Sequence, residues 1–354
     1  LVGGALSLYS AALIRRKGGI HLFVAEDRDA AAYLLNDFYA LLDEERVHFF
    51  PTSYKKSILY GKEDSQGVVQ RTNAMNAVRH MDDGYLVVCT YPDALAERVA
   101  DARTIGERGI RLSVGDRVRI DDLEQSLVER GFEQVDFVYE PGQYSLRGGI
   151  VDIFSYSESR PFRFDFFGDE IDSIRRFNIS SQLSHDKTES VEIIPNLNAC
   201  AEEKVSAARF FGDAVYWFFD ADYALRRVND LRRRVLGEME EPSQIDTILT
   251  SRNGLLGDME GRRVYLLRDN LRERAADAEV KFSTSPQPKF NKKFEVLADD
   301  MSDSALKGYK TYILSESKAQ IERLDNIFRQ MGRRGIEFDS VPATLHEGFV
   351  DHAT

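Results

Sequence analysis

The residues best suited to chemistry lie on one predicted strand, 162–167, which reads Phe-Arg-Phe-Asp-Phe-Phe. Successive side chains of a strand point to opposite faces. The alternation therefore predicts one face of phenylalanines and another that places Phe167 beside Arg163. An exposed aromatic ring next to an arginine is typical of a protein-binding hot spot, in which the ring fills a pocket and the guanidinium donates to carboxylates. A second layer that covers Phe167 is an equally open interpretation.

Turns and strands surround this segment on both sides, and a helix precedes them. Glycine-containing turns at 141–142, 148–149 and 168–169 separate short aromatic and β-branched runs, which predicts consecutive strands. The expected strands are 112–114, 132–139, 139–144, 150–154, 162–167 and 170–177, with 191–194 as the last strand of the sheet. We expect Asp121 or Asp122 to cap the helix and Gly131 to follow its last turn. A helix followed by antiparallel strands predicts an α+β domain over residues 109–195.

Two segments of this domain carry a resemblance to known proteins. RGGIVDIF (147–154) and PFRFDFFGDEIDSIRRF (161–177) resemble the signature of a domain shared by the transcription-repair coupling factor (Mfd) family and the excision-repair protein UvrB. The resemblance is strong over about 110–195 and weak beyond it. In both families this domain is a docking surface for UvrA. Carried over by motif, the resemblance implies UvrA-binding roles for Arg147, Arg163 and Phe167, and Glu170 is a further rim candidate.

Strands alternate with helices on both sides of this domain. In residues 1–108 we expect helices at 6–16, 29–42 (capped by Asp27), 72–80 and 91–99, and strands at 20–25, 48–50 and 86–90. Such alternation predicts a parallel sheet. A strand, an acidic cap and a helix recur at 214–239, with a further strand at 261–267, so residues 196–278 are expected to return to that sheet. Beyond a linker-like stretch at 283–289, residues 279–354 predict a small α/β domain with strands at 310–315 and 336–338 and a helix at 318–331.

The start of the chain decides whether the first domain should bind a nucleotide. A phosphate-binding loop needs glycine N–H groups, a lysine and then Ser or Thr. The corresponding residues are Gly3, Gly4, Leu6 and Ser7, with Leu6 at the lysine position and Ser7 at the magnesium position. Because Leu6 cannot compensate phosphate charge, we interpret this as a degenerate loop that forms a tight turn. The expected fold is thus α/β: a degenerate P-loop (RecA-like) parallel-sheet domain, an inserted α+β UvrA-docking domain and a small C-terminal α/β domain.

Composition limits the remaining function classes. The net charge of −12 argues against a constitutive nucleic-acid binder. Cys89 and Cys200 lack metal-ligand spacing, so we expect neither zinc nor a disulfide, and Cys89 is expected in the core. No apolar run is long enough to span a membrane and no signal peptide is visible, which favours a cytoplasmic location. The chain begins at Leu1 without Met and is expected to be a fragment.

These observations favour a non-catalytic adaptor that recruits UvrA by mimicking UvrB, with no cofactor and no catalytic residues. The resemblance implies that the full-length protein also uses ATP, RNA polymerase and DNA through an ATP-dependent DNA translocase elsewhere. The alternative is a nucleotide-dependent DNA-damage-binding protein like UvrB. However, residues 54–71 contain no long aromatic-rich insertion of the kind that UvrB uses to clamp DNA. A third hypothesis, a DNA-binding scaffold, rests on the arginine-rich helix 223–239, which is also typical of a solvated helix face.

Overall fold

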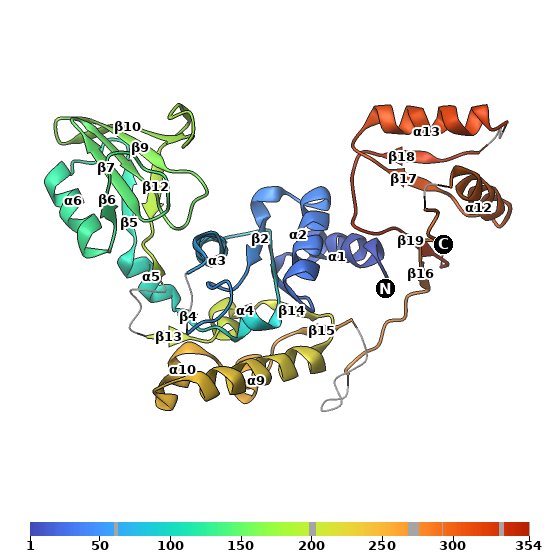
Figure 1. The fold of residues 1–354 in the computed structure, drawn as a ribbon, viewed down its shortest axis with the longest axis horizontal. Helices are drawn as coiled ribbons and strands as arrows, with labels where there is room; N and C mark the ends of the chain where they lie inside the picture. The colour runs from blue at the N-terminus through green and yellow to red at the C-terminus, as the bar shows by residue number, and fades with distance from the viewer. Residues whose placement is uncertain (60–62, 198–202, 268–275, 292, 333–335, 354) are drawn as a thin grey trace. The chain divides into compact units, whose positions relative to one another are not determined.

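The computed structural model describes residues 1–354 except 60–62, 198–202, 268–275, 292, 333–335 and 354 (Figure 1). Cys200 lies outside the described residues. The chain divides into two compact units. The first contains residues 1–17, 32–47 and 275–354, and the second contains residues 18–31 and 48–274. The predicted domain boundaries stay a prediction.

The second unit contains a five-stranded sheet in the order β15-β14-β1-β3-β2. Strand β1 pairs in parallel with β3 and β14, and β14 pairs in parallel with β15. Two strands that follow the inserted domain therefore share a sheet with three that precede it. Asp220 caps helix α9, as expected, because its side chain accepts from the backbone N–H of Tyr223 at 2.8 Å. The strands are β1 (Gly19–Val24), β2 (Val47–Phe50), β3 (Tyr85–Thr90), β14 (Val215–Phe218) and β15 (Val264–Leu266).

Short helices and one minor strand pair accompany this sheet. Helix α3 begins at Ser65, seven residues before its predicted start, and α4 ends at Ala96. Val99, which we expected to be helical, belongs to β4, which pairs with β13. Cys89 is completely buried in β3, as expected for a core residue. The elements are α3 (Ser65–Arg79), α4 (Pro92–Ala96), α5 (Ala102–Arg108), α8 (Ala207–Phe211), α9 (Ala221–Glu238), α10 (Ile245–Ile248), α11 (Arg252–Asp258), β4 (Val99–Ala100) and β13 (Lys204–Val205).

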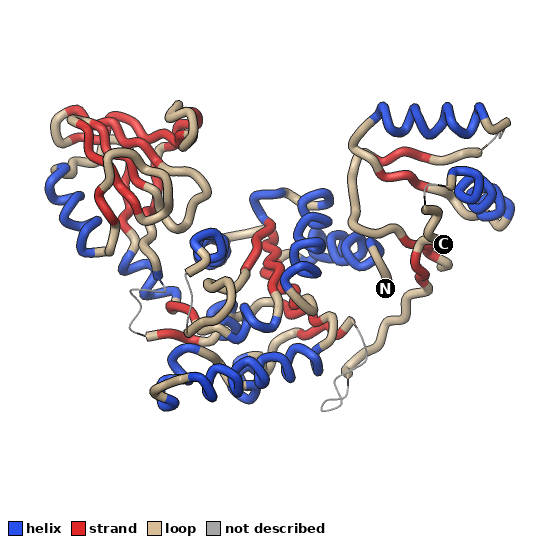
Figure 2. The backbone as a smooth tube through the Cα atoms, in the orientation of Figure 1, coloured by secondary structure: helices blue, strands red, loops and turns tan. Residues whose placement is uncertain are grey.

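The inserted domain is built on a six-stranded sheet in the order β11-β10-β9-β8-β7-β6 (Figures 1 and 2). Helix α6 packs on one face through Leu123 and Leu127, which share a buried core with Val151, Phe162 and Phe164. All neighbouring strands are antiparallel except β6 and β7. The elements are β5 (Ile110–Ser113), α6 (Ile120–Glu129), β6 (Glu133–Gln134), β7 (Gln143–Arg147), β8 (Ile150–Ile153), β9 (Phe162–Phe167), β10 (Glu170–Phe177), β11 (Ser184–Thr188) and β12 (Ser190–Ile193).

Several predictions for this domain were wrong, including the strands expected at 132–139 and 139–144, where the structure has only β6 (Glu133–Gln134) and β7 (Gln143–Arg147). The segment 191–194 is not the last strand of the sheet, because β12 pairs with β5 in a separate antiparallel ladder and β11 takes the sheet edge. Strand β11 reads Ser-His-Asp-Lys-Thr, and its polarity hid it from a search for apolar runs. Arg119, rather than Asp121 or Asp122, occupies the N-cap of α6. Both aspartates lie in the first helical turn, where the helix dipole favours negative charge.

The first unit combines the N-terminal helix with the small C-terminal α/β elements. Ala298, Met301 and Phe328 form the buried core beneath α12 and α13. Helix α12 was not predicted, and the linker-like stretch 283–289 contains β16, which pairs with β19. The predicted strand 336–338 is instead β18, three residues later, parallel to β17. The elements are α1 (Gly4–Lys17), α2 (Arg28–Leu41, shared with the second unit), β16 (Thr284–Pro286), α12 (Phe294–Leu306), β17 (Tyr312–Leu314), α13 (Lys318–Gln330), β18 (Asp339–Val341) and β19 (Phe349–Asp351).

Candidate functional site

Strand β9 has the two faces that its sequence predicts. Phe162 and Phe164 are buried in the core of the inserted domain, with 1% and 0% of their surface exposed. Phe167 points the other way and is 86% exposed. Within the described part of the chain, no second layer covers it. An exposed aromatic ring of this size can serve as an anchor for a partner.

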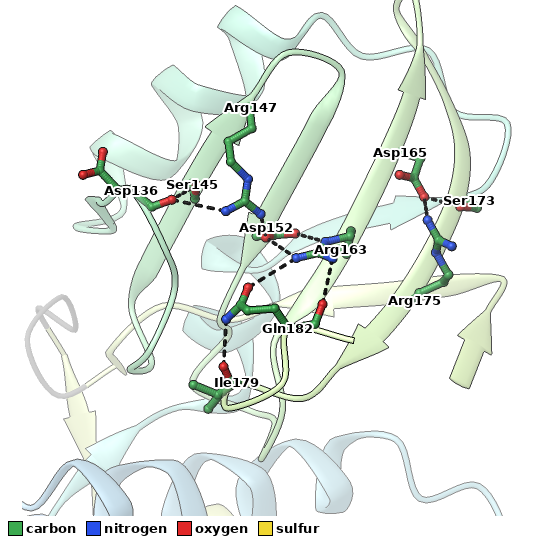
Figure 3. Close-up of polar contacts among 10 residues, drawn as sticks. All are labelled: Asp136, Ser145, Arg147, Asp152, Arg163, Asp165, Ser173, Arg175, Ile179 and Gln182. Carbon is green, nitrogen blue, oxygen red and sulfur yellow. Dashed lines mark hydrogen bonds and ion pairs between the residues drawn. The ribbon is translucent and has the colours of Figure 1, made fainter. Parts of the chain in front are cut away.

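Arg147 and Arg163 meet at one carboxylate, that of Asp152 (Figure 3). The register opposes Asp152 to Arg163, and the Nε and Nη2 atoms of Arg163 donate to the two carboxylate oxygens at 2.7 Å and 2.8 Å. Nη2 of Arg147 donates to the same carboxylate from strand β7. The Asp152 side chain is completely buried. Two guanidinium groups thus share one buried negative charge.

Asp152 is a functional candidate that the sequence analysis missed. Alternation along β8 places Ile150 and Asp152 on one face and Val151 and Ile153 in the core. Alternation along the predicted strand 150–154 sets Asp152 apart from the core positions, but only the register between β8 and β9 places it opposite Arg163.

The two arginines differ in how much of each remains available. Nη1 of Arg163 also donates to the Gln182 carbonyl at 3.2 Å. The Arg163 guanidinium lies 4.5 Å from the centre of the Phe177 ring. Its side chain is 15% exposed, and the hydrogen bonds to Asp152 raise its pKa above the ordinary value. Arg147 is 32% exposed, donates otherwise only to the Asp136 carbonyl at 3.2 Å, and has its guanidinium 5.0 Å from the centre of the Phe137 ring. In the described part of the chain, its Nε and one N–H of each terminal nitrogen have no acceptor.

A second ion pair lies next to the first on the same face. Asp165 is the next residue after Arg163 on the same face of β9. Its carboxylate accepts from Ser173 at 2.7 Å and from Nη2 of Arg175 (Figure 3). The remaining part of this face carries a small apolar cluster of Val138, Phe154 and Phe177. This face therefore carries buried apolar side chains, two ion pairs and, at the end of β9, the exposed Phe167 ring.

Phe167 and Glu170 stand opposite each other at the β9–β10 turn. Gly168 has a φ of +64°, a conformation that L side chains rarely adopt, so glycine suits this tight connection. The Glu170 carboxylate accepts from Nε of Arg117 at 3.3 Å, and both side chains are largely exposed. The structure therefore places Glu170, the predicted rim residue, directly beside the Phe167 ring.

Of the predicted degenerate loop, Gly4, Leu6 and Ser7 lie in the first turn of α1, and other residues of the first unit pack against this turn. The Gly4 N–H, a group of the kind that a phosphate would accept from, donates to the Glu347 carbonyl at 3.0 Å. A Cβ atom on Gly4 would lie 2.5 Å from that oxygen, and one on Gly3 would lie 2.6 Å from the Gly348 carbonyl. Leu6 and Ser7 are buried, and the Ser7 hydroxyl donates to Asp37 at 2.6 Å.

The arginines of α9 are partly committed to neighbouring elements. Arg227 donates to both oxygens of Asp93 at 2.6 Å and 2.8 Å. Arg232 donates to the Leu249 carbonyl and to Asp246 at 2.8 Å and 2.6 Å. These contacts hold the helix against the rest of the unit and leave Arg226 and Arg234 exposed.

The described residues hold neither a metal-binding cluster nor a membrane-spanning helix. No group of three or more His, Cys, Asp and Glu side chains among them could hold a metal ion. The helices within the described ranges include none long and apolar enough to cross a membrane.

Comparison with known proteins identifies the domain that carries the arginine pair. Residues 110–198 match the UvrB interaction domain. The chain carries a UvrB interaction domain. This match covers the strands from β5 to β12 and thus Arg147, Asp152, Arg163 and Phe167.

Matches over about a third to just over half of the chain confirm the resemblance to transcription-repair-coupling factors. The protein of that name from Bacillus subtilis (strain 168) is 29% identical over 210 residues, which are 58% of this chain and 18% of the relative. The one from Escherichia coli (strain K12) is 26% identical over 196 residues, 55% of this chain and 17% of the relative. The one from Haemophilus influenzae is 31% identical over 125 residues, 35% of this chain and 11% of the relative. The chain therefore spans less than a fifth of the length of these relatives.

Proposed function

We propose that this chain is a non-catalytic adaptor that recruits UvrA in transcription-coupled nucleotide excision repair, by offering the docking surface that UvrB offers. The observation that carries the proposal is the open face of the UvrB interaction domain. There Phe167 is 86% exposed at a turn, and the Arg147 guanidinium lies on the same face with free donors. Phe167 would enter an apolar pocket of UvrA, and Arg147 would donate to an acidic group.

The competing function, nucleotide-dependent damage binding, has less support. Leu6, at the position of the lysine in a phosphate-binding loop, cannot compensate the charge of the phosphates. The Gly4 N–H already donates to the Glu347 carbonyl. A nucleotide would have to displace that contact and bind without a lysine. In this proposal, ATP use and the contacts with RNA polymerase and DNA belong to other parts of a full-length, cytoplasmic coupling factor.

A titration of this chain against UvrA without nucleotide tests the proposal. The Arg147→Ala, Phe167→Ala and Glu170→Ala variants are compared with Val128→Ala. Val128 is 56% exposed on α6, the helix that covers the other face of the sheet, so it controls for loss of an exposed apolar side chain. We expect Arg147→Ala and Phe167→Ala to weaken binding by about 1–3 kcal/mol, Glu170→Ala by less, and Val128→Ala to bind like the wild type. Absence of binding by the wild type would refute the proposal.

A parallel titration with ATP tests the alternative. Saturable ATP binding that Gly4→Ala abolishes would favour a UvrB-like nucleotide site, whereas absence of ATP binding agrees with the adaptor.

A further inference from the structure

We infer that Asp152 is a positioning residue of the docking surface, which sets the Arg147 guanidinium for an acidic group of the partner. This inference rests on the proposed UvrA-binding function and deepens it. The geometry on which it stands is one completely buried carboxylate between two arginines of neighbouring strands.

Burial assigns Asp152 an indirect role. With none of its side chain exposed, it cannot touch a partner. Two ordered hydrogen bonds from Arg163, at 2.7 Å and 2.8 Å, fix its plane. The fixed carboxylate then accepts from Nη2 of Arg147, whose Nη1 is held by the Asp136 carbonyl. Arg163 therefore holds the Asp152 carboxylate in place. Asp152 and the Asp136 carbonyl together orient the Arg147 guanidinium, which is the group that would contact the partner.

The charge of the cluster indicates what Arg147 is presented to. Two guanidinium groups and one carboxylate leave one net positive charge, and Asp165, the next carboxylate on the face, is already engaged by Arg175 and Ser173. The free N–H groups of Arg147 match a carboxylate in planar geometry, which Lys could not reproduce. The complementary group on UvrA is accordingly an Asp or Glu side chain.

The sign of the effect separates positioning from simple charge. Replacing Asp152 by Asn removes a negative charge and makes the face more positive, which would speed association with an acidic partner. Loss of the charged acceptor instead leaves Arg147 held only by the Asp136 carbonyl and the Phe137 ring, which loosens its side chain and speeds dissociation. We expect the faster dissociation to outweigh the faster association. The Arg147 side chain has several rotatable bonds and loses rotamer freedom on binding unless Asp152 already holds it.

The test measures association and dissociation rates of the whole chain with UvrA for the wild type, Asp152→Asn, Arg147→Ala and the double variant. We expect Asp152→Asn to dissociate about tenfold faster with association unchanged or faster, and to add less than about twofold in the Arg147→Ala background. Asp93→Asn is the matched control, because Asp93 also accepts two hydrogen bonds from one arginine but lies on α4. It should bind UvrA like the wild type.

Arg163→Lys provides a second variant that keeps the charge and avoids an orphaned carboxylate. Since Lys cannot hold both oxygens of Asp152, we expect UvrA dissociation at least about threefold faster at unchanged net charge. Wild-type dissociation from both Asp152→Asn and Arg163→Lys, while Arg147→Ala loses binding, would overturn this inference and leave the proposed function standing. An effect of Asp152→Asn that is equally large without Arg147 would also overturn it. Absence of UvrA binding by the wild type would refute both.

Discussion

Arg163 and Asp152 face each other across β9 and β8, and both oxygens of the buried carboxylate accept from the one guanidinium, at 2.7 Å and 2.8 Å. Such a pair fixes relative position more than it adds stability, because desolvation of both ions offsets most of their attraction. In this chain the pair also fixes a third residue, Arg147. The ion pair therefore connects the position of β8 and β9 to the orientation of Arg147 on the exposed side of the sheet.

Removal of the shared carboxylate is expected to be costly for folding. Asp152→Ala would leave Arg163, only 15% exposed, without its principal acceptor. We expect the free energy of unfolding to fall by about 3 kcal/mol, as for other broken buried pairs. Chemical denaturation measures the change. Asp121→Ala, which removes an exposed carboxylate in the first turn of α6, should lower it by less than about 1 kcal/mol. Equal losses in the two variants would contradict the buried-pair account.

Phe167 and Phe164 should separate binding from stability, although they lie three residues apart on β9. Phe164→Ala removes a completely buried ring and should lower the free energy of unfolding by about 3–5 kcal/mol. Phe167→Ala removes a ring that is 86% exposed, so it should leave unfolding within about 0.5 kcal/mol of the wild type and weaken UvrA binding. Thermal unfolding and a UvrA titration of both variants test the contrast. A large loss of stability in Phe167→Ala would show that the ring packs against the chain in solution.

The arginines of α9 are expected to serve packing rather than nucleic-acid binding. Arg227→Ala removes two hydrogen bonds to Asp93, and partial exposure of both groups limits the expected loss to about 1 kcal/mol. Arg226→Ala, on an exposed neighbour, should change neither stability nor DNA affinity. Anisotropy titrations with a short duplex at two salt concentrations provide the check. A lower DNA affinity and a shallower salt dependence in Arg226→Ala would restore the DNA-scaffold hypothesis.

The sequence predicted the faces of β9 correctly because alternation is a strict consequence of strand geometry. Phe162 and Phe164 are core residues and Phe167 lies on the opposite face, as the period of two requires. Exposure itself was left open, since no local pattern tells whether a second layer covers a strand. Only the full chain path shows that the apolar cluster around Phe177 covers part of that face and stops short of Phe167.

The contacts that sequence could not supply are those set by register between strands. Asp152 lies eleven residues from Arg163 and five from Arg147, and nothing in those spacings reveals that the three side chains converge. Pairing of β12 with β5, across nearly eighty residues, was missed for the same reason. Local propensity also failed where polarity conceals a strand, as in β11. The parallel arrangement of β1, β3, β14 and β15 was foreseen in kind, since strand–helix alternation imposes it.

His21 should make stability depend on pH below about 6.5. Its ring is buried in β1, where Nδ1 accepts from the Trp217 indole N–H at 3.1 Å and Nε2 lies 3.0 Å from the Gly18 carbonyl. Burial lowers the pKa of His21 below 6.5, although the hydrogen bond to Gly18 opposes the shift. In the unfolded chain the ring takes up a proton as the pH falls through about 6.5, while the folded ring stays neutral until a lower pH. The contribution is therefore fully present above about pH 6.5 and is lost as the pH falls.

The comparison that isolates this contribution is His21→Gln against the wild type. The free energy of unfolding, measured between pH 7.5 and 5 by urea denaturation, should fall more steeply with decreasing pH in the wild type. One group contributes at most about 1.4 kcal/mol per pH unit. Identical pH slopes for the two proteins would show that His21 does not titrate differently on folding.

Gly4 should be intolerant of any side chain, because residues 345–347 pack directly against it at the start of α1. An added Cβ atom would lie 2.5 Å from the Glu347 carbonyl oxygen and 2.9 Å from the Leu345 side chain. The backbone near residue 347 would have to move, and the hydrogen bond from the Gly4 N–H would be lost. We expect Gly4→Ala to lower the stability of the first unit by about 1–3 kcal/mol. Hydrogen exchange should accelerate at residues 345–351 and remain unchanged in the UvrB interaction domain.

Gly237 is the matched control for Gly4, since it lies within α9 and an added Cβ atom would meet nothing within 4 Å. Gly237→Ala should be neutral or stabilising by up to about 1 kcal/mol, because alanine favours the helix. If Gly4→Ala behaved like Gly237→Ala, Glu347 would not occupy the loop in solution. The loop would then be open to a ligand, and the nucleotide titration of Gly4→Ala and the wild type would become the deciding measurement between adaptor and UvrB-like enzyme.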